Sequence, residues 1–159
     1  MKTKLTKMIM GSLSFDCALV CLLAAMTLST HSTAQAAPGG RCDARQLRGL
    51  YIWTFDGYQN FGGNPVPKAL MIGIQFNGNG TFTIPFSTVN IGGNAFEANG
   101  GVGTYTVAAD CTGTLQVTGG TSFNMYVGAG AQQLWITQTG GGPGDGTGLG
   151  VGTATRQPE

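Results

Sequence analysis

Apolar and polar residues alternate along several short stretches of this chain, most clearly in its central part. Tyr105 and Val107 alternate with threonines, and the same alternation recurs around Leu115. A period of two places one set of side chains on a buried face of a strand and the other set in water. The pattern therefore predicts a β-hairpin with strands at 104–107 and 114–118 and a turn at 110–113.

Similar runs rich in threonine, valine, isoleucine and aromatic residues recur along the chain, separated by glycines, as is typical of short strands joined by tight turns. The Asn-Gly-Asn-Gly sequence at 77–80 is a strong hairpin signal. Residues 43–48 are the one candidate for helix, a short turn that Asp43 could cap and Gly49 could end. The remaining predicted strands are 50–58, 69–76, 81–87, 95–98, 122–127, 133–137 and 149–156.

These elements define an all-β fold, because no stretch after Arg48 has the spacing of an amphipathic helix over three turns. Successive hairpins form a meander, and closing the meander into a barrel leaves no exposed edge. We predict an antiparallel up-and-down barrel of about eight strands with a short N-terminal helical turn. A β-sandwich is the alternative. In the barrel the last strand would pair with the first, and Arg156 would lie over an aromatic side chain of the first strand.

The first 36 residues have the three parts of a secretory signal peptide. Lys2, Lys4 and Lys7 give a positive start, residues 17–28 are apolar, and Ala34-Gln35-Ala36 has the small-x-small pattern of a cleavage site. The apolar run is shorter than the roughly 20 residues that a membrane-spanning helix needs. We therefore expect residues 1–36 to be removed, and residues 37–159 to be a single glycine-rich β-barrel domain without a membrane span. The expected location is secreted or periplasmic, as for an exported bacterial protein.

Two cysteines, Cys42 and Cys111, remain after such a cleavage. In an oxidising compartment a pair of cysteines most often forms a disulfide. Two thiolates without histidine are a poor ligand set for zinc, so no metal site is expected. On the chain-entropy model a bridge closing this long loop stabilises the fold by about 4 kcal/mol.

Charge and residue type exclude several functions of the expected mature chain. It has five basic and six acidic residues and no basic patch, which argues against nucleic-acid binding. Its single histidine, His31, belongs to the signal segment. A serine nucleophile activated by histidine is therefore excluded, and nothing indicates a cofactor.

Without histidine, three carboxylates or a tyrosine are the candidates for acid–base chemistry. Asp56 and Asp110 lie at predicted strand ends, where aspartate usually stabilises a turn. Glu97 is flanked by Phe96 and Ala98, and if it points into the barrel, burial would favour its protonated form and make it a weak catalytic candidate or a polar anchor. A solvated position on the strand is the alternative for Glu97.

The aromatic residues on the predicted strands are the strongest candidates for a binding site. An eight-stranded barrel is about the size that either packs solid or holds one small apolar ligand. In the solid alternative these residues only fill a core. In the other, the residues that we expect to bind the ligand are Tyr51, Trp53, Phe55, Glu97, Tyr105 and Trp135.

The sequence Gly49-Leu-Tyr-Ile-Trp53 on the first strand, together with Arg156 on the last, resembles the lipocalin and calycin barrels. In that superfamily an arginine packs across an aromatic residue of the first strand, and Trp53 or Tyr51 would be its partner here. The spacing departs from the family, since Gly49 and Trp53 are four positions apart rather than two. The hairpin at 103–114 also resembles one found in uncharacterised secreted bacterial proteins.

These patterns predict an exported barrel that binds a small hydrophobic molecule, and a binding protein rather than an enzyme. One alternative is a cyclase or isomerase resembling the allene-oxide-cyclase barrels, acting on an apolar substrate. Another is a non-enzymatic surface or interaction protein with a packed interior.

Overall fold

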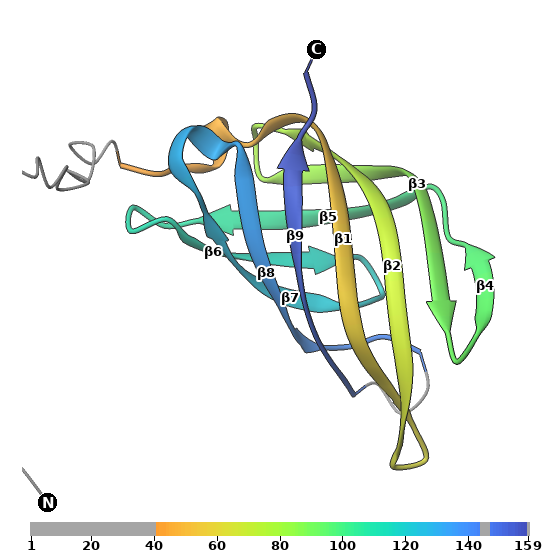
Figure 1. Ribbon diagram of the computed structural model, residues 1–159. Helices are drawn as coiled ribbons and strands as arrows, with labels where there is room; N and C mark the ends of the chain where they lie inside the picture. Colours follow the sequence, from red (N-terminus) through yellow and green to blue (C-terminus); the bar gives the residue numbers. More distant parts are fainter. Residues whose placement is uncertain (1–40, 144–146, 159) are drawn as a thin grey trace, which may run out of the picture. The chain divides into compact units, whose positions relative to one another are not determined.

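A computed structural model describes residues 41–143 and 147–158 of the chain. The predicted signal segment 1–36 lies outside the described residues. Two 3-10 turns and nine strands make up the described part (Figure 1). In chain order they are η1 (Ala44–Gln46), β1 (Arg48–Phe61), β2 (Asn64–Asn77), β3 (Thr81–Ile91), β4 (Asn94–Glu97), β5 (Gly101–Val107), β6 (Thr112–Val117), β7 (Ser122–Val127), η2 (Ala129–Ala131), β8 (Gln133–Gly140) and β9 (Gly148–Arg156).

Eight of these strands close into an antiparallel barrel. The hydrogen-bonded order runs β2-β1-β9-β8-β7-β6-β5-β3, and β3 pairs again with β2 to complete the ring. In Figure 1 the last strand, β9, lies between β8 and β1. The predicted barrel is thus confirmed over the sandwich. None of the helical turns in the described ranges is long and apolar enough to cross a membrane.

The β1–β2 hairpin is much longer than the sequence pattern indicated. Both strands have 14 residues, and they pair continuously from Arg48–Asn77 to Phe61–Asn64. Gly62 and Gly63 form the turn with φ values of 58° and 80°, in the left-handed region that glycine tolerates. The predicted strands 50–58 and 69–76 were too short at the end near the turn. The residues there are mostly polar and include Pro65 and Pro67, which do not resemble an apolar strand.

The ring is not equally closed along its length. β3 pairs with β5 over Thr81–Ile84, whereas its other end, Thr88–Ile91, pairs with β4. Within the described part of the chain, β4 pairs with β3 alone. β4 is therefore a ninth strand appended to the barrel wall, and it leaves the gap between itself and the β6–β7 turn unbridged by a sheet ladder.

Tyrosine hydroxyls tie the two 3-10 turns to the barrel. The Tyr51 hydroxyl donates to the Ala131 carbonyl at 2.5 Å, and the Tyr105 hydroxyl lies 2.8 Å from the Ala44 carbonyl and 3.0 Å from that of Leu47. Burial raises the pKa of both phenols above its ordinary value. These contacts hold η1 and η2 against the sheet, so the tyrosines serve the fold at this end of the barrel.

The N-terminal helical turn is shorter than predicted. Only Ala44–Gln46 forms a 3-10 turn, which Asp43 caps by accepting a hydrogen bond from the Arg45 amide at 2.8 Å. Gly49, expected to end a helix, instead lies inside β1 with a φ of 96°. The turn stays short because Leu47 is buried in the barrel core and the chain must become extended to enter β1.

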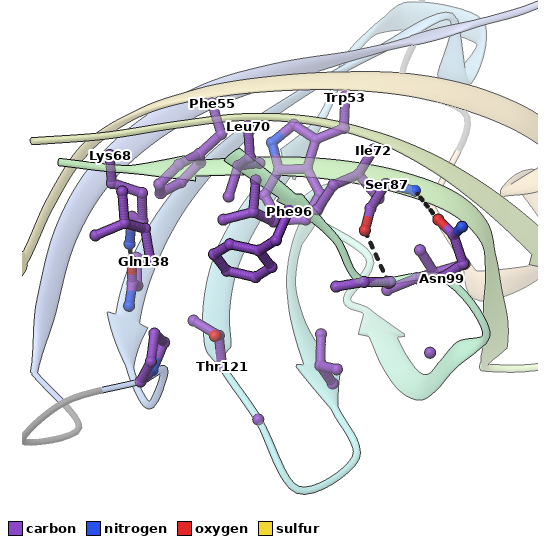
Figure 2. Close-up of a pocket in the computed structure, with 18 of the residues that line it drawn as sticks. Trp53, Phe55, Lys68, Leu70, Ile72, Ser87, Phe96, Asn99, Thr121 and Gln138 are labelled. Carbon is purple, nitrogen blue, oxygen red and sulfur yellow. Dashed lines mark hydrogen bonds between the residues drawn. The ribbon is translucent and has the colours of Figure 1, made fainter. Parts of the chain in front are cut away.

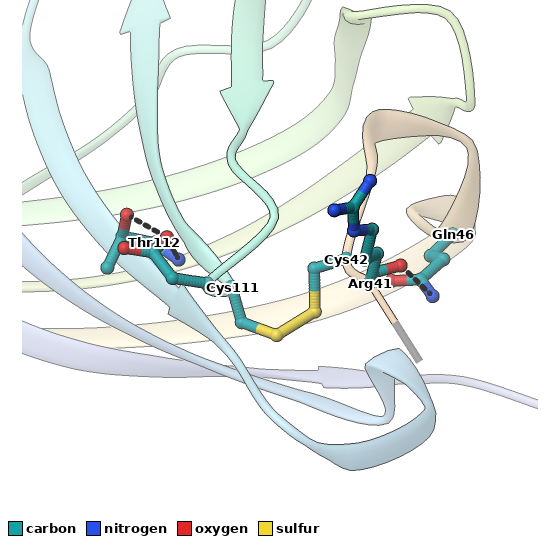
Figure 3. Close-up of a disulfide and its surroundings, with 6 residues drawn as sticks. Arg41, Cys42, Gln46, Cys111 and Thr112 are labelled. Carbon is teal, nitrogen blue, oxygen red and sulfur yellow. Dashed lines mark hydrogen bonds between the residues drawn. A yellow bond between two sulfur atoms is a disulfide. The ribbon is translucent and has the colours of Figure 1, made fainter. Parts of the chain in front are cut away.

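The disulfide joins Cys42, just before η1, to Cys111 in the β5–β6 turn, as predicted (Figure 3). The two Cα atoms are 5.0 Å apart across a sequence separation of 69 residues. The bridge thus anchors the N-terminal segment to the hairpin at the same end as the tyrosine hydroxyls.

Of the two aspartates that were predicted at strand ends, one lies in a turn and the other does not. Asp110 accepts hydrogen bonds from the Thr112 amide at 3.1 Å and from its hydroxyl at 2.7 Å, and these bonds lower the pKa of the carboxyl group, which confirms its turn role. For Asp56 the prediction of a strand end was wrong. It lies exposed on the outer face in the middle of β1, because that strand continues to Phe61.

The first and last strands pair as predicted, with Arg156 directly opposite Tyr51. Arg156 is half-buried at the end of β9, and its charge acts on the Tyr51 phenol. The stacking of the guanidinium on an aromatic ring stays a prediction.

Candidate functional site

A cavity of about 560 Å³ lies inside the barrel, at the end away from the two tyrosines (Figure 2). This volume falls within the range of about 300–1,000 Å³ that is usual for small-molecule sites. Most of its wall is apolar and comes from the inward faces of β1, β2, β3 and β7. Large apolar residues of this wall are Trp53, Phe55, Leu70, Ile72, Ile84 and Phe123.

The aromatic side chains of the wall pack edge to face. The ring of Trp53 lies 4.7 Å from that of Phe123 and 5.6 Å from that of Phe55, with both pairs near perpendicular. This is the favoured geometry for aromatic pairs, because the positive edge of one ring meets the negative face of the other. The three rings therefore form one packed aromatic cluster at the floor of the cavity.

Glycines on β9 make room for this floor. A Cβ atom at Gly150 would lie 2.4 Å from the Phe55 ring, and one at Gly152 would lie 2.8 Å from Trp53 Nε1. The rings of β1 therefore lie directly against the backbone of β9. Trp53 Nε1 is buried there, and no described residue accepts its hydrogen.

The mouth of the cavity lies where β4 diverges from the barrel. On one side is Phe96, whose side chain is 47% exposed, followed by residues 98–101, and on the other side is the β6–β7 turn at residues 117–121. Figure 2 shows the Phe96 ring in front of the apolar wall, with Thr121 from the other side of the mouth below it. An apolar ligand entering here would meet an aromatic side chain before it reached the interior.

Hydrogen bonds attach the β4 side of the mouth to β3. The Ser87 amide donates to Asn99 Oδ1 at 2.7 Å, and the Ser87 hydroxyl donates to the Ala98 carbonyl at 2.8 Å. Both bonds are drawn in Figure 2. They attach the chain after β4 to β3, so the mouth is shaped by a fixed backbone rather than by a free loop.

The opposite end of the cavity is polar and centres on Lys68. Its ammonium group donates to Gln138 Oε1 at 2.6 Å and to Gln59 Oε1 at 3.2 Å. It also lies 5.2 Å from the centre of the Phe55 ring, within cation–π range. All three polar side chains are buried, and they come from β1, β2 and β8.

The glutamine amide groups connect this end to the chain between β8 and β9. Gln59 Nε2 donates to the Pro143 and Thr147 carbonyls at 2.7 and 2.6 Å, and Gln138 Nε2 donates to the Gly141 carbonyl at 3.0 Å. Each amide nitrogen thus donates to a backbone carbonyl. Both amide oxygens therefore point toward the Lys68 ammonium. The orientation of the glutamines follows from these bonds.

The Lys68 side chain is only 7% exposed, and burial lowers its pKa below the ordinary value. Among the described residues that line the cavity, Lys68 is the one ionisable side chain. Arg45 forms an ion pair with Asp43, outside this cavity. A buried cation, whose partners among the described residues are two amide oxygens and a ring face, is the dominant electrostatic feature of the site.

The structure brings together two of the six residues that the sequence suggested for ligand binding. Trp53 and Phe55 line the cavity. Tyr51 and Tyr105 are buried elsewhere in the core, and their hydroxyls are used by backbone carbonyls. Trp135 is 47% exposed on β8, where its ring lies 6.0 Å from that of Tyr126.

Glu97 also lies outside the cavity wall. It is exposed on β4 and accepts a hydrogen bond from Asn99 Nδ2 at 3.1 Å. This is the solvated strand position that was the alternative for Glu97. No group of three or more His, Cys, Asp or Glu side chains that could hold a metal ion occurs within the described ranges.

Sequence reasoning missed Lys68, Gln59 and Gln138, although a signal for them exists. Lys68 continues the inward series of Ile72 and Leu70 on β2, and the glutamines continue the inward series of β1 and β8. Each lies beyond the end of a strand as it was predicted from the apolar run. Extending the period of two across these polar positions would have placed all three inside the barrel.

Fold and site together define a class: a closed eight-stranded antiparallel barrel with an internal, mainly apolar cavity that has one buried cation. Comparison with protein-family models and with curated proteins found no match.

Proposed function

We propose that this protein binds one small, predominantly apolar molecule inside its barrel and that it does so outside the cytoplasm. The observation that carries the proposal is the cavity of about 560 Å³ with its apolar wall and lateral mouth. A ligand gains affinity chiefly by moving apolar surface out of water, at roughly 25 cal/mol per Å². Aromatic side chains that are already packed against one another favour binding, because little further side-chain freedom is lost.

Export rests on the signal-like pattern of residues 1–36 and is supported by the Cys42–Cys111 disulfide, since such bridges persist in oxidising compartments. The resemblance to lipocalin and calycin barrels supports the same function, because the closed barrel that it implied is present. The cyclase alternative had one weak catalytic candidate. Its candidate, Glu97, lies outside the wall, so no observation favours that activity.

The test is binding of a neutral apolar fluorophore, N-phenyl-1-naphthylamine, by the mature protein. We expect saturable one-to-one binding in the micromolar range, equivalent to about −8 kcal/mol. Leu70→Trp should abolish it, because Leu70 lines the cavity and a larger side chain fills the space. Met71→Trp is the matched control, since Met71 is the next residue and points to the exposed outer face.

Equal binding by both variants, with Leu70→Trp folded by circular dichroism, would place the fluorophore outside the cavity. No saturable binding by the wild type would favour the interaction-protein alternative. Native mass spectrometry of protein purified from its own host then identifies any retained molecule.

A further inference from the structure

Lys68 has a position that the proposed function does not explain. An ammonium group taken out of water loses a large hydration energy, so buried lysines are normally paired with a carboxylate. Here the described partners of the ammonium are two amide oxygens and one ring face. Lys68 is also the only lysine of the sequence after residue 7. A neutral side chain would suit a purely apolar site better.

The described residues around the ammonium hold it in place with uncharged groups. Gln59 and Gln138 are fixed by backbone carbonyls of the β8–β9 connection, and both present oxygen to Lys68 Nζ. An ammonium has three hydrogens to donate, and these glutamines accept two of them. Among the described residues, no acceptor is assigned to the third hydrogen and no carboxylate pairs with the ammonium at this end of the cavity.

We propose that Lys68 is the head-group anchor of the site and that the ligand is an apolar monocarboxylate. The carboxylate would accept a hydrogen bond from Lys68 Nζ, and its hydrocarbon body would lie along Phe55, Leu70 and Ile72 toward the mouth at Phe96. Figure 2 shows this order of side chains, with Lys68 and Gln138 at one end of the cavity and Ser87 at the other. This inference rests on the proposed function and names its ligand class.

Charge selects the carboxylate over other head groups. An amine head would meet a like charge in a medium of low polarity, and an alcohol would leave the ammonium without a counterion. A carboxylate forms a charge-assisted hydrogen bond, which is shorter and stronger than a neutral one. The site therefore discriminates by the head group while the wall accepts any body of suitable size.

The experiment compares decanoate with 1-decanol, which share one chain and differ in the head group. Affinities are measured by displacement of N-phenyl-1-naphthylamine from wild-type protein and from Lys68→Met, Lys68→Arg and Arg48→Met. The last variant removes one positive charge from an exposed site on β1, at a residue that does not line the cavity. It controls for the net charge of the protein.

The wild type should bind decanoate at least about tenfold more tightly than 1-decanol, as expected for a hydrogen bond to a charged group. Lys68→Met should lose this preference and keep its affinity for 1-decanol, and Lys68→Arg should retain most of it. Arg48→Met should behave as the wild type. Displacement by decanol with no preference for decanoate, or an unchanged preference in Lys68→Met, would overturn the role of Lys68 and leave the proposed function intact. If neither compound displaces the fluorophore and the fluorophore itself does not saturate, the proposed function fails instead.

The pH profile separates an electrostatic role from a merely structural one. Decanoate affinity should fall as alkaline pH deprotonates Lys68, whereas decanol affinity should not. No other titratable side chain among the described residues faces the cavity: Asp56 and Tyr58 of β1 and Glu97 of β4 are exposed outside it. A parallel loss for both compounds would mean that the barrel itself fails at high pH.

Discussion

At the scale of single residues, the charge of Lys68 shapes the energetics of the barrel. An unfolded chain exposes this side chain, whose pKa then has its ordinary value of about 10.4. In the folded protein burial lowers the pKa. Between these two pKa values the unfolded chain binds the extra proton, so the Lys68 contribution to stability rises with pH through this window.

We predict that the free energy of unfolding of the wild type, minus that of Lys68→Met, increases from neutral pH toward pH of about 10. Urea unfolding of both proteins without ligand measures it. The subtraction matters because Tyr51 and Tyr105 act in the opposite sense: burial raises their pKa values, so ionisation destabilises the fold at higher pH. A difference that does not vary with pH would contradict the burial of a charged Lys68.

At the scale of elements, β9 contributes to the cavity floor because its glycines have no side chains. Its inward positions include Gly150 and Gly152, against which the Phe55 and Trp53 rings pack. Glycine weakens an isolated strand, yet here it allows aromatic rings to approach the backbone closely. The β1–β9 seam, which closes the barrel, therefore also positions the floor of the cavity.

Gly152→Ala should destabilise the protein by about 1–3 kcal/mol, the usual penalty for overpacking a core. The new Cβ would lie 2.2 Å from the Thr54 carbonyl oxygen and 2.8 Å from Trp53 Nε1. Gly140→Ala is the matched control, because it also lies in a strand and its Cβ would meet nothing within 4 Å. Urea unfolding should show a change within about 0.5 kcal/mol for the control. Equal losses in the two variants would mean that the β9 backbone is not in close contact with the rings.

At the scale of the whole molecule, the two ends of the barrel are specialised. One end is closed by η1, η2, the tyrosine hydroxyls and the disulfide. The other end contains the cavity, the Lys68 cluster and the mouth beside β4. We therefore expect the contacts at the closed end to be separable from binding, because the disulfide and the tyrosine hydroxyls lie outside the cavity wall.

The disulfide provides the test of this separation. Replacing both Cys42 and Cys111 by serine should lower the free energy of unfolding by about 4 kcal/mol, since the bridge closes a long loop. Binding of N-phenyl-1-naphthylamine should be unchanged at temperatures where the variant is folded, because neither cysteine lines the cavity. Free thiols in denatured, unreduced wild type, or a loss of binding in the folded variant, would contradict this division.

The sequence by itself determined the class of fold, the disulfide and the hairpin turns. These follow from local chemistry: the period of two around Tyr105 and Leu115, the Asn-Gly turns, and a single cysteine pair after the signal-like residues 1–36. The inclusion of Trp53 and Phe55 in the cavity wall agrees with the same alternation on β1. No long-range information was needed for these features.

The tertiary structure alone decided where the cavity lies and which inward-facing polar residues meet at its end. Strand register across the closed ring brings Gln59, Lys68 and Gln138 together from three strands, and no local pattern encodes such a meeting. It also decided that Trp135 is outside and that Tyr51 and Tyr105 serve the closed end. The physical reason is that alternation assigns a residue to a face, whereas its height along the barrel, and hence its partners, depends on pairing between strands distant in sequence.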